Sequence, residues 1–296
     1  MRQFILGTDW WTDCDDVVAL RLLARAHKAG EIKLLGIVLN ACMEHSVTSL
    51  EGFLNTETIC DIPIGIDSEA TDFGGNPPYQ KRLSQFATKY RSNSDAKDAV
   101  KLYRTILAKA DTPVELIEIG YPQALTALLL SEADDICGFS GMELVKSKVS
   151  KIWMMAGKWG QNPGRENNFA RNQRSRVAAN ILCDLCPVPV TFLGWEVGAA
   201  VITGGNLDKN DPLYLALWDH GSFNGRSSWD PMLALLAVIG NAQKAGYTMV
   251  YGKASVDALT GENRFTVNPM GLHGYVVKSK DDTYYADAIN QRIMRQ

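Results

Sequence analysis

Short apolar segments alternate with helix-like segments along most of this chain, and the alternation limits the folds it can adopt. Residues 4–9 (FILGTD) and 32–40 (IKLLGIVLN) are largely apolar, as buried strands are. Residues 17–30, between them, have the spacing of an amphipathic helix that closes at Gly30. The same patterns predict further strands at 62–67, 114–120, 151–157 and 187–194, and further helices at 46–60, 81–90, 95–110, 122–134, 169–186 and 230–242.

The order of these segments predicts an α/β fold. Apolar strands separated by helices pair in parallel and are covered on both faces. Residues 247–279 differ, since they indicate short antiparallel strands, and residues 283–296 close the chain as a helix. Without an internal repeat, a low-complexity segment or a convincing linker, we expect one domain over residues 1–296. Its sheet would be central, mostly parallel and Rossmann-like, with a short antiparallel C-terminal extension.

Composition excludes several classes of function. The net charge of -3 gives no footprint for nucleic acid or for an anionic membrane. No apolar run could span a bilayer, and the N-terminal run is too short for a signal peptide, so we expect a cytoplasmic protein. The six cysteines are scattered, as reduced thiols are. Cys183 and Cys186 have C-x-x-C spacing but no further zinc ligands nearby, and we interpret them as part of a helix end.

Four aspartates crowd the turn between the first strand and the first helix: Asp9, Asp13, Asp15 and Asp16. Helix capping explains two of them, with Asp13 as the N-cap and Asp16 as its capping-box partner. It leaves Asp9 and Asp15 unexplained. Carboxylates so close together repel one another unless a positive charge neutralises them, and a hard divalent cation with oxygen ligands suits that role.

Polar residues also follow later strands. Glu166, Asn167 and Asn168 precede one helix, and Asp230 begins another directly after Trp229. Each group taken alone fits ordinary helix capping or a polar loop. Together they lie at the carboxyl ends of several parallel strands, where ligands of α/β proteins bind.

Five segments, in order over roughly residues 4–240, resemble the inosine–uridine nucleoside hydrolase family. TDWWTDCDD (8–16) resembles a longer variant of the family's D-x-D-x-G-x-D-D turn, and GYPQALTALL (120–129) is similar to its G-P-L-T-N-L-A segment. GRENNF (164–169) looks like A-E-F-N, and SSWDPMLALLAV (227–238) looks like H-D-P-x-A. GWEVGAAVITGG (194–205) resembles the stretch before the last helices.

The resemblance implies a calcium-dependent hydrolase of the N-glycosidic bond of ribonucleosides. Asp15 matches the general base that takes a proton from the attacking water. The positions that match calcium ligands are Asp9, Asp16, Asp230 and the backbone carbonyl of Gln123, and those that match ribose contacts are Asn40, Glu166 and Asn168. The family also implies homo-dimers or homo-tetramers.

This sequence departs from the family pattern at the end of the site that would hold the base. Trp229 stands where many members have a histidine that helps the base to leave, and a purine-preferring subgroup shares the tryptophan. Trp229 would then stack on a purine, or simply pack as a large aromatic residue. His220 is a candidate leaving-group acid if its loop folds back over the pocket. Gln161 or Asn162 would replace an asparagine of the family pattern.

Further alternatives stay open. Tyr79 and Phe73 lie in a Gly/Pro-rich loop and are candidates for a lid over the base. The same fold would also suit a non-catalytic calcium-dependent nucleoside- or sugar-binding protein. A magnesium-dependent phosphohydrolase would require phosphate-binding motifs that later turns lack. The sequence does not decide between purine and pyrimidine, or between plain and modified nucleosides.

Overall fold

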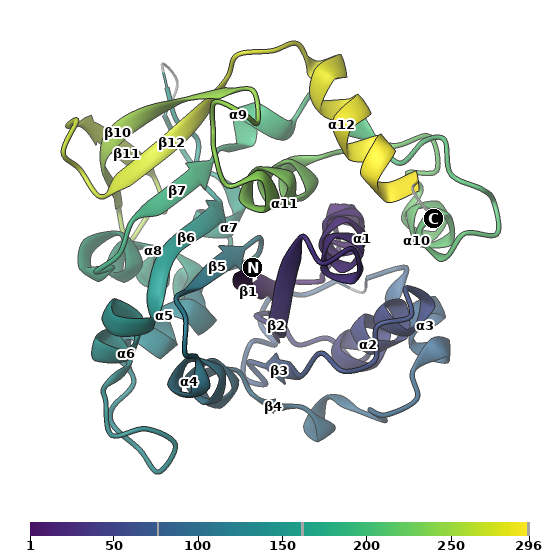
Figure 1. Cartoon of the computed structure of the whole chain (residues 1–296), viewed down its shortest axis with the longest axis horizontal. Helices are drawn as coiled ribbons and strands as arrows, with labels where there is room; N and C mark the ends of the chain where they lie inside the picture. The colour runs from purple at the N-terminus through teal and green to yellow at the C-terminus, as the bar shows by residue number, and fades with distance from the viewer. Residues whose placement is uncertain (76, 161–162, 295–296) are drawn as a thin grey trace.

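The computed structural model describes residues 1–75, 77–160 and 163–294. Within these residues, ten strands form one sheet in the order β11-β10-β12-β7-β6-β5-β1-β2-β3-β4 (Figure 1). The strands are β1 (Arg2–Thr8), β2 (Ile32–Leu39), β3 (Ile64–Ile66), β4 (Lys97–Asp98), β5 (Val114–Glu118), β6 (Val149–Met155), β7 (Val190–Leu193), β10 (Tyr247–Val256), β11 (Asn263–Val267) and β12 (His273–Lys278). Two short strands, β8 (Ile202–Thr203) and β9 (Arg226–Ser227), pair separately.

Most of the large sheet is parallel, as the alternation predicts. All pairings among strands β1 to β7 are parallel, and β12 also pairs with β7 in parallel. Strand β10 pairs with β11 and β12 in antiparallel fashion, so the predicted C-terminal extension is confirmed and continues the main sheet. The parallel strands carry their loops at a shared carboxyl edge, where the acidic turn lies.

Helices cover both faces of the sheet (Figure 1). One face packs against α1 (Asp15–Lys28), α2 (Ser46–Thr56), α11 (Trp229–Ile239) and α12 (Asp282–Met294). The other packs against α4 (Ala99–Lys109), α5 (Gln123–Leu130), α6 (Gly141–Lys148) and α8 (Gln173–Leu185). Alternate residues of β1 enter the two cores, because Phe4 and Leu6 face one set of helices and Ile5 the other. The remaining helices are α3 (Gln80–Leu83), α7 (Asn167–Ala170), α9 (Trp195–Gly198) and α10 (Pro212–His220).

The predicted helix at 81–90 is wrong. The chain forms only α3 and a 3₁₀ turn at Ser84–Phe86 before it becomes irregular. The cause is the buried carboxylate of Glu51, which accepts hydrogen bonds from the backbone N–H groups of Thr88, Lys89 and Tyr90 at 3.2, 2.7 and 2.9 Å. These backbone N–H groups therefore have hydrogen-bond partners without a helix, and the chain can take an irregular conformation here.

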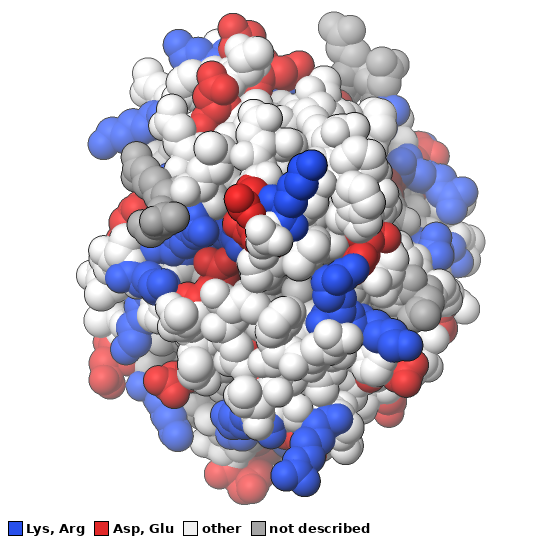
Figure 2. Space-filling view, turned by 90° about the vertical axis from the view of Figure 1, so that its right-hand side faces the viewer, with Lys and Arg blue, Asp and Glu red and all other residues white. Residues whose placement is uncertain are grey.

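The surface carries no dominant charge of one sign on the face that Figure 2 shows, where basic and acidic side chains are interspersed. This agrees with the small net charge of the sequence. None of the helices in the described part of the chain combines the length and apolar character required to cross a bilayer.

Candidate functional site

The acidic turn begins where β1 ends. The carboxylate of Asp9 accepts the backbone N–H of Trp11 at 3.0 Å, and that of Asp16 accepts both the Thr8 hydroxyl and the backbone N–H of Trp10. Trp10 has a φ of 48°, a conformation that is costly for a bulky residue. Its buried indole N–H donates to Ser49 at 2.9 Å, which helps to fix the turn.

The beginning of α11 brings a further carboxylate to this turn. The backbone N–H of Asp230 donates to Oδ2 of Asp15 at 3.0 Å, although 215 residues separate the two positions. Asp15, Asp16 and Asp230 are all buried, and each offers an oxygen that lies within 4.8 Å of those of the other two. The structure thus brings together three of the acidic residues that the sequence singles out.

These carboxyl groups have strongly raised pKa values. Burial is the main cause, because it disfavours the charged form, and repulsion from neighbouring acids adds to it. The pKa of Asp9 rises to about 8, and the pKa values of Asp15, Asp16 and Asp230 lie well above their ordinary range. A buried set of oxygen donors that repel one another fits a hard divalent cation, which would stabilise the ionised forms.

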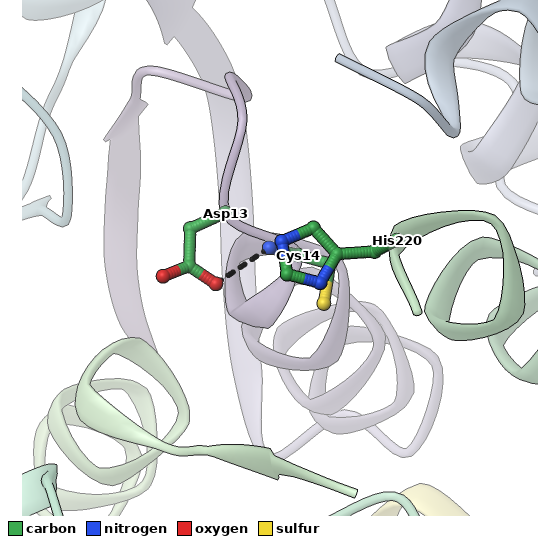
Figure 3. Close-up of side chains that lie close together, drawn as sticks. All are labelled: Asp13, Cys14 and His220. Carbon is green, nitrogen blue, oxygen red and sulfur yellow. Dashed lines mark hydrogen bonds between the residues drawn. The ribbon is translucent and has the colours of Figure 1, made fainter. Parts of the chain in front are cut away.

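Asp13 has a different environment, and its prediction as the N-cap of α1 is wrong. Cys14 occupies the cap position and no side chain caps the helix. The Asp13 carboxylate instead pairs with the Arg226 guanidinium at 2.6 and 2.9 Å. It also accepts the backbone N–H of Cys14 at 2.8 Å (Figure 3). Burial alone would raise the pKa of Asp13, but Arg226 lowers it below the ordinary value. Asp13 is therefore neutralised within the protein.

His220 ends α10 beside Asp13 and Cys14 (Figure 3). Its Nδ1 lies 2.8 Å from the Ser222 hydroxyl. Partial burial lowers the pKa of His220, which favours the neutral imidazole. His220 does not line the cavity described next, so its role as a leaving-group acid stays a prediction.

A cavity of about 480 Å³ opens over the acidic turn. This volume is within the range of small-molecule sites. The predicted site residues that line it are Asp9, Asp15, Asp16, Glu166, Asn168, Trp229 and Asp230. Asn167, which the sequence analysis placed in the same polar group, also lines it, and so do Arg171 and Trp195, which the sequence did not single out for this role. A larger cavity of about 720 Å³ lies elsewhere, next to α1 and α10, but there Arg21 is paired with Glu57 and Asp211.

Glu166 and Asn168 sit where the loop after β6 enters α7. Glu166 accepts the backbone N–H of Asn168 at 2.8 Å and that of Gly157 at 2.9 Å, and burial raises its pKa to about 7. The side-chain amide of Asn168 donates to the Met155 carbonyl at 2.9 Å, which ties it to the end of β6. Both side chains are therefore held in place before any ligand arrives.

Asn40 and Gln123 are buried near the end of β1 and do not line this cavity. The Asn40 amide donates to Glu118 at 2.7 Å and its oxygen accepts the backbone N–H of Tyr121 at 2.9 Å, while the Gln123 amide donates to the Asn40 carbonyl. Gly120 permits this convergence, because a Cβ there would lie 2.4 Å from the Asp9 nitrogen and 2.5 Å from the Asn40 oxygen. The predicted ribose contact of Asn40 and metal contact of Gln123 remain predictions.

Glu118, the last residue of β5, was not foreseen as part of this region. It is buried, and its Oε2 has no hydrogen-bond partner among the described residues. Burial raises its pKa to about 8. The one available signal was the presence of two acids, Glu115 and Glu118, in a short strand that the pattern predicts to be buried, VELIEIG.

Tryptophan rings form one wall of the cavity. Trp229 and Trp195 are nearly parallel, with ring centroids 6.5 Å apart, and the Trp229 indole donates to the Trp195 carbonyl at 2.7 Å. Tyr79 and Phe73, the expected lid residues, are buried and do not line the cavity; Phe73 stacks on Tyr121 with centroids 4.1 Å apart.

Gln161 and Asn162, the predicted replacements for an asparagine of the family pattern, lie outside the described residues.

The fold and the site together define an α/β protein with a carboxylate-rich cavity suited to a cation and a small polar ligand. No family model and no curated protein matches the sequence. Solved structures match it over almost its entire length. One is the purine-preferring ribonucleoside hydrolase from Gardnerella vaginalis, with a TM-score of 0.71 and 16% identity, covering 99% of this chain and 98% of that chain.

Two other solved structures resemble this chain to a similar degree. The inosine–uridine preferring nucleoside hydrolase from Bacillus anthracis matches with a TM-score of 0.67 and 14% identity, covering 99% of each chain. The type III effector protein XopQ, solved in complex with adenosine diphosphate ribose, matches with a TM-score of 0.67 and 14% identity, covering 99% of this chain and 93% of that chain. The chain therefore has the nucleoside hydrolase fold, which confirms the resemblance drawn from the sequence at the level of the fold.

Proposed function

We propose that this protein is a calcium-dependent hydrolase of the N-glycosidic bond of ribonucleosides. The observation that carries the proposal is the buried group of Asp15, Asp16 and Asp230 in one cavity with Glu166 and Asn168. Such a cavity offers oxygen donors for a cation next to polar side chains for a sugar. Structural likeness to two nucleoside hydrolases supports the reaction class.

The residues that would hold calcium are Asp9, Asp16, Asp230 and the backbone carbonyl of Gln123. The three carboxylates line one cavity, and burial together with the neighbouring acids raises their pKa values. When bound, calcium would lower the pKa of a water molecule and orient it together with the ribose hydroxyls.

Asp15 would act as the general base. One of its oxygens accepts the Asp230 backbone N–H, which fixes the carboxylate and leaves the other oxygen to accept a proton from the attacking water. Glu166, which caps α7, and Asn168, within α7, would bind ribose hydroxyls from their fixed positions. As the glycosidic bond lengthens, the ribose gains positive charge, which the surrounding carboxylates would stabilise.

The aromatic wall would hold the base. Trp229 lines the cavity and would stack on a purine, whose planar ring fits an indole better than a smaller pyrimidine does. Stacking favours a base that accepts a proton as it leaves, either from solvent or from His220. The purine preference stated for the Gardnerella vaginalis structure is consistent with this assignment.

A second candidate function keeps the ligand and drops the reaction. Trp229 replaces the histidine of the resembled pattern, and one neighbour is an effector solved with bound adenosine diphosphate ribose. A non-catalytic ribosyl-binding protein would use the same cavity.

The first experiment measures free ribose released from a panel of purine and pyrimidine ribonucleosides in calcium. Asp15→Asn removes the proposed base with little change in shape, and Asp281→Asn, at an exposed position, is the matched control. We expect release by the native protein and the control, and a loss of about 100-fold or more in Asp15→Asn. Calcium-dependent binding without release from any nucleoside would refute the hydrolase and favour the binding protein.

A further inference from the structure

The lining of the acidic cavity includes one cationic side chain among the described residues, Arg171. It follows α7 directly, one helical turn after Asn168. The remaining charged residues of the lining are Asp9, Asp13, Asp15, Asp16, Glu166 and Asp230. A plain nucleoside carries no negative charge, so it would leave this cation without an anionic partner.

Arg171 is held in place without an acid. Its guanidinium carbon lies 4.5 Å from the centroid of the Trp11 ring, and Nη2 donates to the Phe73 carbonyl at 2.9 Å. Among the described residues, no ion pair involves Arg171, and no hydrogen bond occupies its Nε or Nη1. Nine other arginines in the described part of the chain do pair with carboxylates: Arg2, Arg21, Arg25, Arg82, Arg104, Arg174, Arg226, Arg264 and Arg292.

We propose that Arg171 binds a phosphoryl group on the 5′ carbon of the ribosyl ligand, so that the protein prefers 5′-phosphorylated ribosyl compounds over plain nucleosides. The inference rests on the proposed function, because that function sets the orientation of the ribose. Calcium takes the ribose hydroxyls and the tryptophan wall takes the base. The 5′ carbon is then the remaining substituent position on the sugar, and Arg171 is the cation of the described lining that can take an anionic group there.

A planar guanidinium with two unoccupied N–H groups suits a phosphoryl oxygen pair. Because Trp11 and Phe73 already fix the side chain, little rotamer freedom is lost on binding. The acidic side chains of the cavity would repel a phosphoryl group, but several of them are neutralised. Arg226 neutralises Asp13, and a bound cation would neutralise the carboxylates that hold it.

A purely structural role for Arg171 makes a different prediction. Asn172 and Arg174 also bind the loop that contains Phe73. Asn172 donates a hydrogen bond to Asp72, and Arg174 donates one to Asp67. Arg174 does not line the cavity. Arg174→Gln is therefore the matched control, since it loses a similar connection to the loop without changing the charge of the cavity lining.

The test is calorimetric binding of ribose, ribose 5-phosphate and inorganic phosphate to the full chain in calcium. We expect ribose 5-phosphate to bind about 10- to 100-fold more tightly than ribose, as hydrogen bonds to charged groups allow. Arg171→Gln should abolish this preference and leave ribose binding unchanged, Arg171→Lys should retain part of it, and Arg174→Gln should retain all of it.

Equal affinity for the two sugars, or a preference that survives in Arg171→Gln, would overturn the inference. Inorganic phosphate that binds as tightly as ribose 5-phosphate would overturn it as well, since the phosphoryl group would then be bound without the sugar. Failure of the proposed function is a separate result, because it is measured by the absence of ribose release and not by sugar affinity.

Discussion

Replacing Glu118 by glutamine should stabilise the protein at neutral pH. The carboxyl group is buried with a pKa of about 8, against an ordinary value of 4.5. Below pH 4.5 it is protonated in both the folded and unfolded states and its titration costs nothing. Between pH 4.5 and 8 the folded state binds a proton that the unfolded state does not, so this group lowers stability as the pH rises.

The size of the effect follows from the shift. At pH 7 the pH lies 2.5 units above the ordinary value of 4.5, which at 1.36 kcal/mol per unit amounts to about 3 kcal/mol. Glutamine does not titrate, and its oxygen can still accept the amide of Asn40 and the backbone N–H of Gly120. Glu118→Gln should therefore match the native protein near pH 4.5 and exceed its free energy of unfolding by about 3 kcal/mol at pH 7.

Urea unfolding at a series of pH values between 4 and 8, in the presence of a chelator, measures this difference. Glu115→Gln is the control on the same strand, because its carboxylate pairs with Arg2 and its loss should destabilise the protein. Parallel pH profiles for the native protein and Glu118→Gln would refute the reasoning, since they would show that Glu118 does not take up a proton on folding.

Two further predictions concern the cation site and the buried ion pair that Arg21 of α1 makes with Glu57. Calcium at 100 times its Kd should add about 3 kcal/mol to the free energy of unfolding of the native protein and so raise its melting temperature. This rise should be lost in Asp16→Asn. It should be kept in Asp13→Asn, because Arg226 already neutralises the Asp13 carboxylate. A calorimetric scan that shows the same rise in Asp16→Asn would contradict the ligand assignment. Arg21→Leu should cost about 3 kcal/mol by urea unfolding, because it leaves Glu57 buried beside a weaker partner at 3.4 Å, and an unchanged midpoint would disprove that.

The sequence predicts the strand ends well because parallel strands must be apolar on both faces. That constraint locates Asp9 after β1 and Asp230 at the beginning of α11, and both side chains line one cavity in the structure. Neither position depends on a detail of side-chain packing. Hydrophobic spacing therefore predicts the first strand and α11. It does not predict α9, and the single helix expected at 169–186 is divided into α7 (Asn167–Ala170) and α8 (Gln173–Leu185).

Other parts of the site depend on contacts that no local pattern encodes. Trp195 lines the cavity because α9 turns back toward α11, and its Trp229 partner is 34 residues away in the chain. Arg171 reads as one more basic residue in a polar helix, and only its packing on Trp11 and its position at the cavity distinguish it. The capping prediction for Asp13 is wrong for the same reason, since its partner Arg226 is 213 residues away.

The buried carboxylates of the acidic site lower the stability of the folded protein, and this cost indicates that they serve another function. Asp15, Asp16 and Asp230 are buried and close together, and none of them forms an ion pair within the described part of the chain, so neutral isosteres at these positions would fold more favourably in the absence of a cation. Asp13, only two residues from Asp15, shows that the fold can supply an arginine to an acid in this turn. We therefore assign the carboxylates without an arginine partner to a cation from solution. Binding of that cation would offset the loss of stability that these buried carboxylates cause.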